Sequence, residues 1–362
     1  MRPTHVLLAF VVGALAVPAC GGAIAPSTDG GQGAVTGSSG GASSEPPSST
    51  LDAGTTSQVS PPATCTIIPA GSGSPGSGAP ELVASLSEPA GIAIDGQYAY
   101  VASYEVGPLY RVSLKDGSTT TLESLGVTNV AINSTTVFSV GFPDINSEDN
   151  GLVVSCAKTG CGGSYTTLAS GQSLLWGVAA DETSVYWTNQ GGSGSGLFKA
   201  PVGGGAPTTL AAAVNADSIA VSGGRVFYVA TKGQTGDSGL YSVSIDGGAV
   251  TEVLPPPADG SVAAIAVDCA SVYYSLTDGT VGKVPIAGGP PVVLATGARD
   301  VLQIAVDAAN LYFGDATGIA YVPTGGGAVT TIPGTSWYTG LAVDGSFIYW
   351  TPTEGGLMRM AK

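Results

Sequence analysis

Histidine is almost absent from this sequence, and its absence excludes several kinds of chemistry. The only histidine, His5, lies at the very start of the chain, inside an apolar leader. A chain cleaved after the leader therefore has no Ser-His-Asp or Cys-His machinery, no histidine general base and no histidine metal ligand. Catalysis by carboxylates, lysine or tyrosine stays open, but the sequence favours a protein that is not an enzyme.

Charged residues are also scarce, and basic ones are the scarcest. Only 10% of the 362 residues are charged, with 11 Lys and Arg against 26 Asp and Glu, which gives a net charge of −15. This balance argues against a nucleic-acid partner, which requires a basic face. Low charge combined with 43% hydrophobic residues predicts a large packed core instead of a disordered chain.

The N-terminal apolar run is too short to span a bilayer comfortably. Val6–Val17 follows the basic Arg2 and precedes small residues and Cys20. This arrangement resembles a bacterial lipoprotein signal with its lipobox. The resemblance implies cleavage before Cys20, lipidation of that cysteine, and a membrane partner through the lipid anchor. Gly21, in place of Asp, implies sorting to the outer membrane, with the periplasmic and the exposed side both open. Ordinary secretion with a spare Cys20 thiol is the alternative.

Large apolar residues are nearly missing from Gly21 to about Pro62, a stretch of Gly, Ser, Thr, Pro and Ala. Such a segment cannot bury enough surface to fold, and it predicts a tether. We therefore divide the chain into a signal peptide (1–19), a lipidated cysteine with tether and lead-in (20–79), and one folded domain (80–362).

The sequence does contain one internal repeat, which occurs seven times. The copies begin at Gly91, Asn129, Gly177, Ser218, Ala264, Gln303 and Gly340, so their starts are 38, 48, 41, 46, 39 and 37 residues apart. Each copy holds two short strand patterns and, except for the last copy, is followed by two more, with glycine-rich turns between them. A period near forty with four strands predicts an all-β, seven-bladed β-propeller with four antiparallel strands per blade.

The last copy ends after its third strand, and the missing fourth strand has a counterpart at the other end. Pro80–Leu86 (PELVASL) precedes the first copy and reads like the outer strands of the other repeats. We predict that this segment completes the C-terminal blade and closes the ring, because closure removes an open sheet edge.

Several strand phrases carry a family resemblance. VYWTN (185–189), IYWTP (348–352) and LYFGD (311–315) resemble the YWTD-type repeats of low-density-lipoprotein-receptor-related propellers. The wider pattern over about 80–362 is similar to the YWTD-like propellers of bacterial surface lipoproteins. The resemblance implies the fold and says little about function. Those propellers usually have six blades, so seven is a departure, and the aspartate of the motif is mostly missing.

Two groups of acidic residues invite a metal interpretation. An acid recurs after the first strand of the repeat, and Asn or Ser replaces it in two copies; the positions are Asp95, Asn133, Asp181, Ser222, Asp268, Asp307 and Asp344. We interpret these as turn residues that bind their own backbone. The segment Asp144–Gly151, with Asn146, superficially resembles a calcium loop, but its glycine and glutamate spacing does not fit. We therefore expect a polar loop and no cofactor, with calcium as the alternative.

Four cysteines remain besides Cys20, and an exported chain favours disulfides over free thiols. Cys156 and Cys161 flank a short turn and are predicted to pair, which leaves Cys65 with Cys269. Cys269 lies in a turn between the first two strands of a repeat. We therefore expect Cys65 and the tether on that side of the ring, called the bottom.

The opposite side, the top, is the predicted binding face, because its loops are longer and function gathers on such loops. Trp187 and Trp350 belong to strands and should be core, whereas Trp176 and Trp337 precede the first strands. Packing between blades is the alternative for this second pair. The complete set of predicted top-face ligand residues is Trp176, Trp337, Tyr338, Glu88, Asp217, Asp259, Asp300, Asp144, Asn146 and Asn189.

Three functions compete at this point. The favoured one is a monomeric, lipid-anchored envelope propeller that binds a protein or glycan ligand through its top face. The second is a structural component of an envelope complex. The third is a histidine-independent lyase or hydrolase. The residues do not name the ligand.

Overall fold

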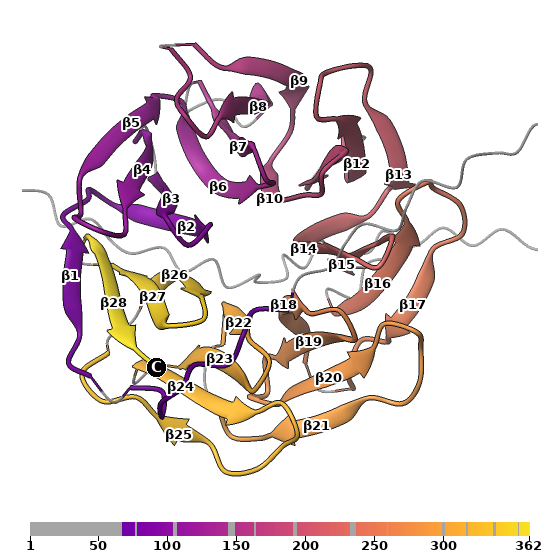
Figure 1. Ribbon diagram of the computed structural model, residues 1–362. Helices are drawn as coiled ribbons and strands as arrows, with labels where there is room; N and C mark the ends of the chain where they lie inside the picture. Colours follow the sequence, from indigo (N-terminus) through magenta and orange to yellow (C-terminus); the bar gives the residue numbers. More distant parts are fainter. Residues whose placement is uncertain are drawn as a thin grey trace, which may run out of the picture. The chain divides into compact units, whose positions relative to one another are not determined.

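Seven small antiparallel sheets form a ring in the computed structural model of this chain (Figure 1). The structure describes residues 67–362 apart from 77, 104–106, 144–148, 163, 191–193, 232–236, 259, 299–300, 316–317, 336–337 and 354. Each sheet has four strands, which we call a to d from the centre outward. The fold is therefore the predicted seven-bladed β-propeller.

The first four blades follow one another along the chain. Blade 1 contains β2 (Pro89–Ile94), β3 (Tyr98–Ser103), β4 (Leu109–Ser113) and β5 (Thr119–Glu123). Blade 2 contains β6 (Gly126–Ile132), β7 (Thr136–Phe142), β8 (Gly151–Ala157) and β9 (Thr166–Gln172). Blade 3 contains β10 (Leu175–Ala180), β11 (Ser184–Asn189), β12 (Gly196–Pro201) and β13 (Thr208–Ala212). Blade 4 contains β14 (Asn215–Ser222), β15 (Arg225–Thr231), β16 (Ser238–Ser244) and β17 (Thr251–Leu254).

The last three blades complete the ring. Blade 5 contains β18 (Val262–Val267), β19 (Ser271–Leu276), β20 (Val281–Pro285) and β21 (Val292–Ala295). Blade 6 contains β22 (Ile304–Val306), β23 (Asn310–Asp315), β24 (Gly318–Pro323) and β25 (Thr330–Thr331). Blade 7 contains β26 (Tyr338–Val343), β27 (Phe347–Pro352), β28 (Leu357–Ala361) and β1 (Glu81–Ala84).

The ring closes as the sequence predicts, because β1 from the start of the domain is strand d of the C-terminal blade. β1 pairs antiparallel with β28, with Glu81 opposite Arg359 and Leu82 opposite Met358. The turn after β4 makes room for this strand through Gly117, which has a φ of +71°. A β-carbon there would lie 2.1 Å from the Val83 carbonyl oxygen, so residue 117 must be glycine.

Apolar side chains fill the interfaces between neighbouring blades. Seven core clusters occur, one for each pair of adjacent blades, including blades 7 and 1. Strand b supplies the largest members, and Trp187 and Trp350 are 0% and 1% exposed, which confirms their predicted core positions. Alternating strand side chains reach both neighbouring blades, and this makes the ring one continuous packed unit.

The described part of the lead-in lies against the bottom of the ring, where the a–b and c–d turns are. The Ile68 carbonyl accepts a hydrogen bond from the Ala308 amide, 2.8 Å away, in the a–b turn of blade 6. Gly76 donates to the Ala361 carbonyl at 3.2 Å. This is the side predicted for the end of the tether. Within the described ranges, no helix is long and apolar enough to cross a membrane.

Candidate functional site

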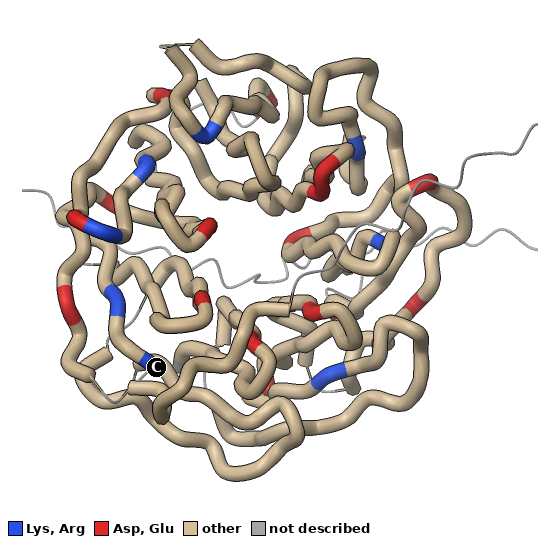
Figure 2. Tube along the Cα trace, viewed as in Figure 1, with Lys and Arg blue, Asp and Glu red and all other residues tan. Residues whose placement is uncertain are grey.

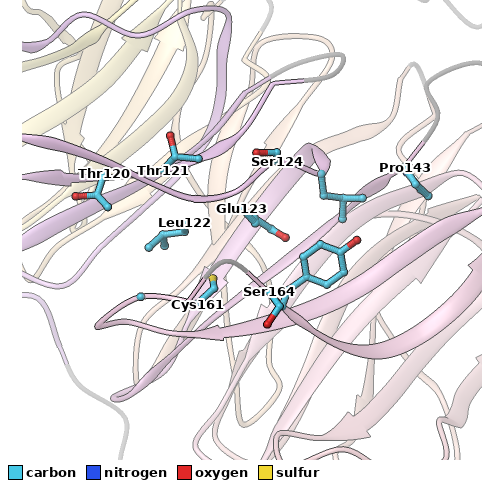
Figure 3. Close-up of a pocket in the computed structure, with 12 residues that line it drawn as sticks. Thr120, Thr121, Leu122, Glu123, Ser124, Pro143, Cys161 and Ser164 are labelled. Atoms are coloured by element: carbon cyan, nitrogen blue, oxygen red, sulfur yellow. The ribbon is translucent and has the colours of Figure 1, made fainter.

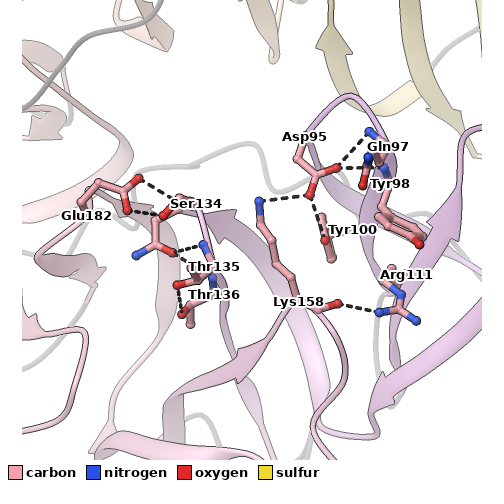
Figure 4. Close-up of polar contacts among 11 residues, drawn as sticks. Asp95, Gln97, Tyr98, Tyr100, Arg111, Ser134, Thr135, Thr136, Lys158 and Glu182 are labelled. Carbon is pink, nitrogen blue, oxygen red and sulfur yellow. Dashed lines mark hydrogen bonds and ion pairs between the residues drawn. The ribbon is translucent and has the colours of Figure 1, made fainter.

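The recurring aspartates of the a–b turns are turn residues, as expected. In blade 1 the Asp95 carboxylate accepts hydrogen bonds from the amides of Gln97 and Tyr98, at 3.1 and 2.9 Å, and from the Tyr100 hydroxyl at 3.0 Å (Figure 4). Lys158 of blade 2 adds an ion pair at 3.0 Å. Burial raises the Asp95 pKa, but these bonds outweigh burial and hold the pKa below its ordinary value.

This arrangement of aspartate and tyrosine repeats with the same spacing of five residues. The tyrosine hydroxyl donates to the aspartate in four further blades, at distances of 2.7, 2.9, 3.0 and 2.9 Å for the pairs Asp181–Tyr186, Asp268–Tyr273, Asp307–Tyr312 and Asp344–Tyr349. The two blades without the aspartate also lack the hydroxyl: Asn133 is followed by Phe138, and Ser222 by Phe227. The acid and the tyrosine therefore form one structural unit.

Basic residues on strand c use the same face to join neighbouring blades. In blades 1, 3, 5 and 7 such a residue donates to the carbonyl that follows strand c of the next blade. The bonds are 2.6 Å for Arg111 to Lys158, 2.8 Å for Lys199 to Ile245, 2.7 Å for Lys283 to Thr324 and 2.6 Å for Arg359 to Leu114. The bottom charges thus hold the blades together, and this leaves the top as the candidate site.

At the top end, the inner strands share an irregularity that exposes particular side chains. The pairing of strands a and b shifts register near residues 90, 128, 176, 217, 263 and 339, as in a β-bulge. Among the described residues, two large apolar side chains at the top ends of strands a are open to solvent. Trp176 of blade 3 is 53% exposed, and Leu302 of blade 6 is 59% exposed.

Trp176 and Asp217 lie on adjacent bulges, and neighbouring blades fix their backbones. The Trp176 carbonyl accepts a bond from the Asn129 side chain of blade 2 at 3.4 Å. The Asp217 carbonyl accepts one from the Thr188 hydroxyl of blade 3 at 3.1 Å. Gly177 approaches Asp217 so closely that a β-carbon would lie 2.5 Å from its carbonyl oxygen. The backbone positions of Trp176 and Asp217 are therefore fixed next to each other on one rim.

The Asp217 carboxyl differs electrostatically from the bottom carboxylates. Burial raises its pKa to about 6. No hydrogen bond to its side chain occurs among the described residues to offset that burial, in contrast to Asp95 and Asp181. Figure 2 shows Asp and Glu around the central opening, where the a–b turns also lie, and Lys and Arg farther out. A rim with an available carboxyl and an exposed indole suits a neutral or cationic ligand.

The predicted ligand residues fall into three groups. Trp176, Asp217 and Glu88 lie at the top with accessible or half-buried side chains. Asn189 and Tyr338 are buried and make hydrogen bonds within the protein: the Asn189 amide to Gln172 at 3.0 Å and the Tyr338 hydroxyl to Gln303 at 3.1 Å. Outside the described residues lie Trp337, Asp259, Asp300, Asp144 and Asn146.

Backbone strain is also concentrated on this face. Among the described residues other than glycine, positive φ occurs at Glu88 (45°), Leu174 (45°) and Ala213 (54°). All three lie in d–a connections, immediately before or near an inner strand. Strained backbone of this kind is more common at binding sites than elsewhere, so its location supports the top face.

Sequence reasoning missed two features of this molecule. Leu302 is one, because an isolated leucine gives no signal of exposure. Glu123 is the other: it ends an outer strand, yet it is only 6% exposed, and its carboxylate accepts a hydrogen bond from Ser139 of blade 2. The unusual pattern TTTLE, with an acid where other repeats have small or apolar residues, is the signal that marks it.

The disulfide predicted from the short spacing is present. Cys156 and Cys161 are bonded across the c–d connection of blade 2, with their Cα atoms 5.0 Å apart. Cys269 is also disulfide-bonded, and its predicted partner Cys65 lies outside the described residues, as does Cys20. The described residues contain no group of three or more His, Cys, Asp and Glu side chains that could hold a metal ion. Asp149, from the candidate calcium loop, accepts a bond from Ser173 at 2.9 Å.

Comparison with known proteins supports the fold alone. No protein-family model and no curated protein matches the sequence. Among solved structures, the protein YCF48 bound to a D1 peptide superposes with a TM-score of 0.58 at 12% identity, over 82% of this chain and 98% of that one. The computationally designed Ika8 protein has a TM-score of 0.55 at 15% identity, over 78% and 100%. The GH74 enzyme of Niastella koreensis has a TM-score of 0.55 at 14% identity, over 82% of this chain and 53% of that one. The chain is a seven-bladed β-propeller, a fold shared by interaction modules and enzymes.

Proposed function

We propose that this protein is a lipid-anchored propeller of the bacterial cell envelope that binds a neutral or cationic ligand, first of all a glycan, on the rim of its top face. One observation carries the proposal. The described bottom aspartates of the a–b turns are bonded to their own turns and tyrosines, whereas Trp176 and Asp217 at the top are not used in this way.

The chemistry of these two side chains favours a sugar. An exposed indole offers a flat apolar surface with little conformational entropy to lose, and sugar rings present flat C–H faces. A half-buried carboxyl beside it can accept hydrogen bonds from hydroxyl groups. YCF48, which has a similar fold, binds a D1 peptide, so a protein ligand is the second candidate for this chain.

The ligand proposal is tested on a glycan array with the purified full-length protein in detergent. Wild type should bind a restricted set of glycans, and Trp176→Ala and Asp217→Asn should each lose at least tenfold in affinity. Val293→Ser is the control, because Val293 is 56% exposed but lies on the outer strand β21. If no glycan binds, or if Trp176→Ala binds as well as wild type, the glycan proposal is wrong.

The anchor rests on the sequence around Cys20 and is tested separately. Wild type expressed in a bacterium should partition into the detergent phase and carry acyl chains by mass spectrometry. Cys20→Ser should move the protein to the aqueous phase, because it removes the lipidated side chain. Equal partitioning of both proteins would contradict lipidation without affecting the top-face site.

A further inference from the structure

A cavity of about 540 Å³ opens at the outer side of the interface between blades 1 and 2, and its described lining does not include Trp176 or Asp217. Its walls are the end of β5 with the residues that follow it, and the c–d connection of blade 2 that contains Cys161 and Ser164 (Figure 3). Glu123 is among the lining residues, between these two walls. The volume falls within the range of small-molecule sites.

Beside this cavity, blade 2 departs from the packing seen in blades 3 to 7. In each of blades 3 to 7, the strand-b side chain that packs against the preceding blade is aromatic. These side chains are, in blade order, Trp187, Tyr228, Tyr274, Phe313 and Trp350. At that position blade 1 has the smaller Val101 and blade 2 has Ser139. A serine leaves the volume of an aromatic ring unfilled, and the side chain of Glu123 from blade 1 enters this space and bonds to Ser139.

One oxygen of that carboxylate is left unsatisfied. Oε1 of Glu123 accepts the Ser139 hydroxyl, but Oε2 is buried and has no hydrogen-bond partner among the described residues. Among the described lining residues there is no Lys, Arg or His, and Tyr165 is the only one besides Glu123 whose side chain can ionise, since Cys161 is in a disulfide. A buried carboxylate without a cation is costly, so a native protein rarely keeps one without a use.

We propose that this cavity binds an alkylammonium group, from a free amine or a lysine side chain, with Glu123 as its counter-ion. An ammonium supplies both the missing donor and the missing charge, whereas a hydroxyl supplies only the donor. Thr121, Ser124 and Ser164 can accept its remaining N–H groups, and Leu122 and Leu125 can contact a short alkyl chain. The site is independent of the top face proposed above.

The pH dependence follows from the same carboxyl. Burial raises the pKa of Glu123 to about 7, although the hydrogen bond from Ser139 opposes this rise. The ammonium pairs with the ionised form, so affinity should rise from pH 6 to pH 8 and level off above the pKa. A neutral ligand would not show this rise.

The test is isothermal titration of the full-length protein with 1,5-diaminopentane and with pentane-1,5-diol, which has the same chain without the charge. We expect saturable binding of the diamine, tighter at pH 8 than at pH 6, and at least tenfold weaker binding of the diol. Glu123→Gln should weaken the diamine at least tenfold. Glu182→Gln is the control and should leave diamine binding unchanged, because Glu182 lies on the bottom, where it accepts hydrogen bonds from Ser134.

A second variant guards against misfolding of the first. Thr121→Tyr narrows the cavity from its exposed wall and leaves Glu123 in place. It should also weaken diamine binding, while the melting temperature stays within about 2–3 °C of wild type. Nα-acetyl-lysine methylamide distinguishes a partner's lysine from a free amine as the natural ligand. If it binds more tightly than the diamine, the ligand is a lysine side chain; if it binds more weakly, the ligand is a free amine. Three results would each overturn the proposal: no binding of the diamine, binding of the diol as tight as that of the diamine, or binding of the diamine by Glu123→Gln as tight as by wild type.

Discussion

The Asp181 carboxylate accepts the hydroxyl of Tyr186 at 2.7 Å, five residues along the same hairpin, and the amides of Thr183 and Ser184 at 2.7 and 2.8 Å. One carboxylate thus fixes the a–b turn and satisfies a buried phenol. The hydrogen bonds outweigh burial and lower the Asp181 pKa, whereas the Tyr186 pKa is raised, first by burial and then by Asp181. The unit is structural, and its energy can be measured.

Replacing both partners should therefore cost less than the sum of the two single replacements. Tyr186→Phe removes one hydrogen bond and should cost about 1 kcal/mol of unfolding free energy. Asp181→Asn keeps the turn but weakens the bond to Tyr186, at a cost of about 1–2 kcal/mol. The double variant recreates the Asn133 and Phe138 pair of blade 2 and should cost less than the sum. Urea unfolding measures all three, and strict additivity would argue against a coupled unit.

Ring closure by β1 predicts opposite results for two neighbouring residues. Ala84 is 7% exposed and packs in the cluster between blades 7 and 1, whereas Leu82 is 57% exposed. Ala84→Asp buries an unpaired charge and should destabilise by about 3 kcal/mol or more, and Leu82→Asp should change stability by about 0.5 kcal/mol or less. Thermal unfolding distinguishes them. Equal effects would mean that β1 does not contribute to closure.

The four tryptophans offer a matched pair for separating structure from binding. Trp187 is fully buried, and its indole donates to Gln172 at 2.9 Å, whereas Trp176 is 53% exposed. Trp187→Ala should cost about 3–5 kcal/mol of unfolding free energy, because it leaves a large cavity. Trp176→Ala should cost about 0.5 kcal/mol or less. A large loss for Trp176→Ala would show that this side chain supports the fold, and the proposed rim would lose its anchor.

Glu123 should give the protein a specific dependence of stability on pH. Its pKa is about 7 in the folded protein and 4.5 ordinarily, so between these values the folded state holds a proton that the unfolded chain has released. Its contribution is therefore greatest below pH 4.5, falls as pH rises to about 7 and then stays constant, a change of about 3 kcal/mol at most.

The measurement compares unfolding free energies at pH 5 and pH 8 for wild type and Glu123→Gln, which stays neutral throughout. The difference between the two proteins should shift by about 1–3 kcal/mol in favour of wild type at pH 5. Glu182→Gln serves as the control for a general change in charge. If the difference between wild type and Glu123→Gln is the same at both pH values, Glu123 is not a buried titrating group.

The sequence by itself determined the fold because the relevant signals are local or periodic. Seven copies of one pattern, strand patterns of period two, and a surplus strand matched to a missing one are sufficient to predict seven blades closed by Pro80–Leu86, within which β1 (Glu81–Ala84) forms. The role of Asp95 and its equivalents was equally predictable, because an acid bonds to amides two and three residues ahead. The same holds for Cys156 and Cys161, which lie five residues apart.

The tertiary structure alone decided which polar and aromatic side chains are available. Trp176 and Asn189 both lie at the top end of blade 3, yet Trp176 is 53% exposed and Asn189 only 4%, and the Asn189 amide is bonded to Gln172 of blade 2. Glu123 and Ser139 come from different blades, and their contact depends on a space that an absent aromatic ring leaves between them. Exposure and cavities arise where blades meet, and the pattern within one repeat carries no information about its neighbour.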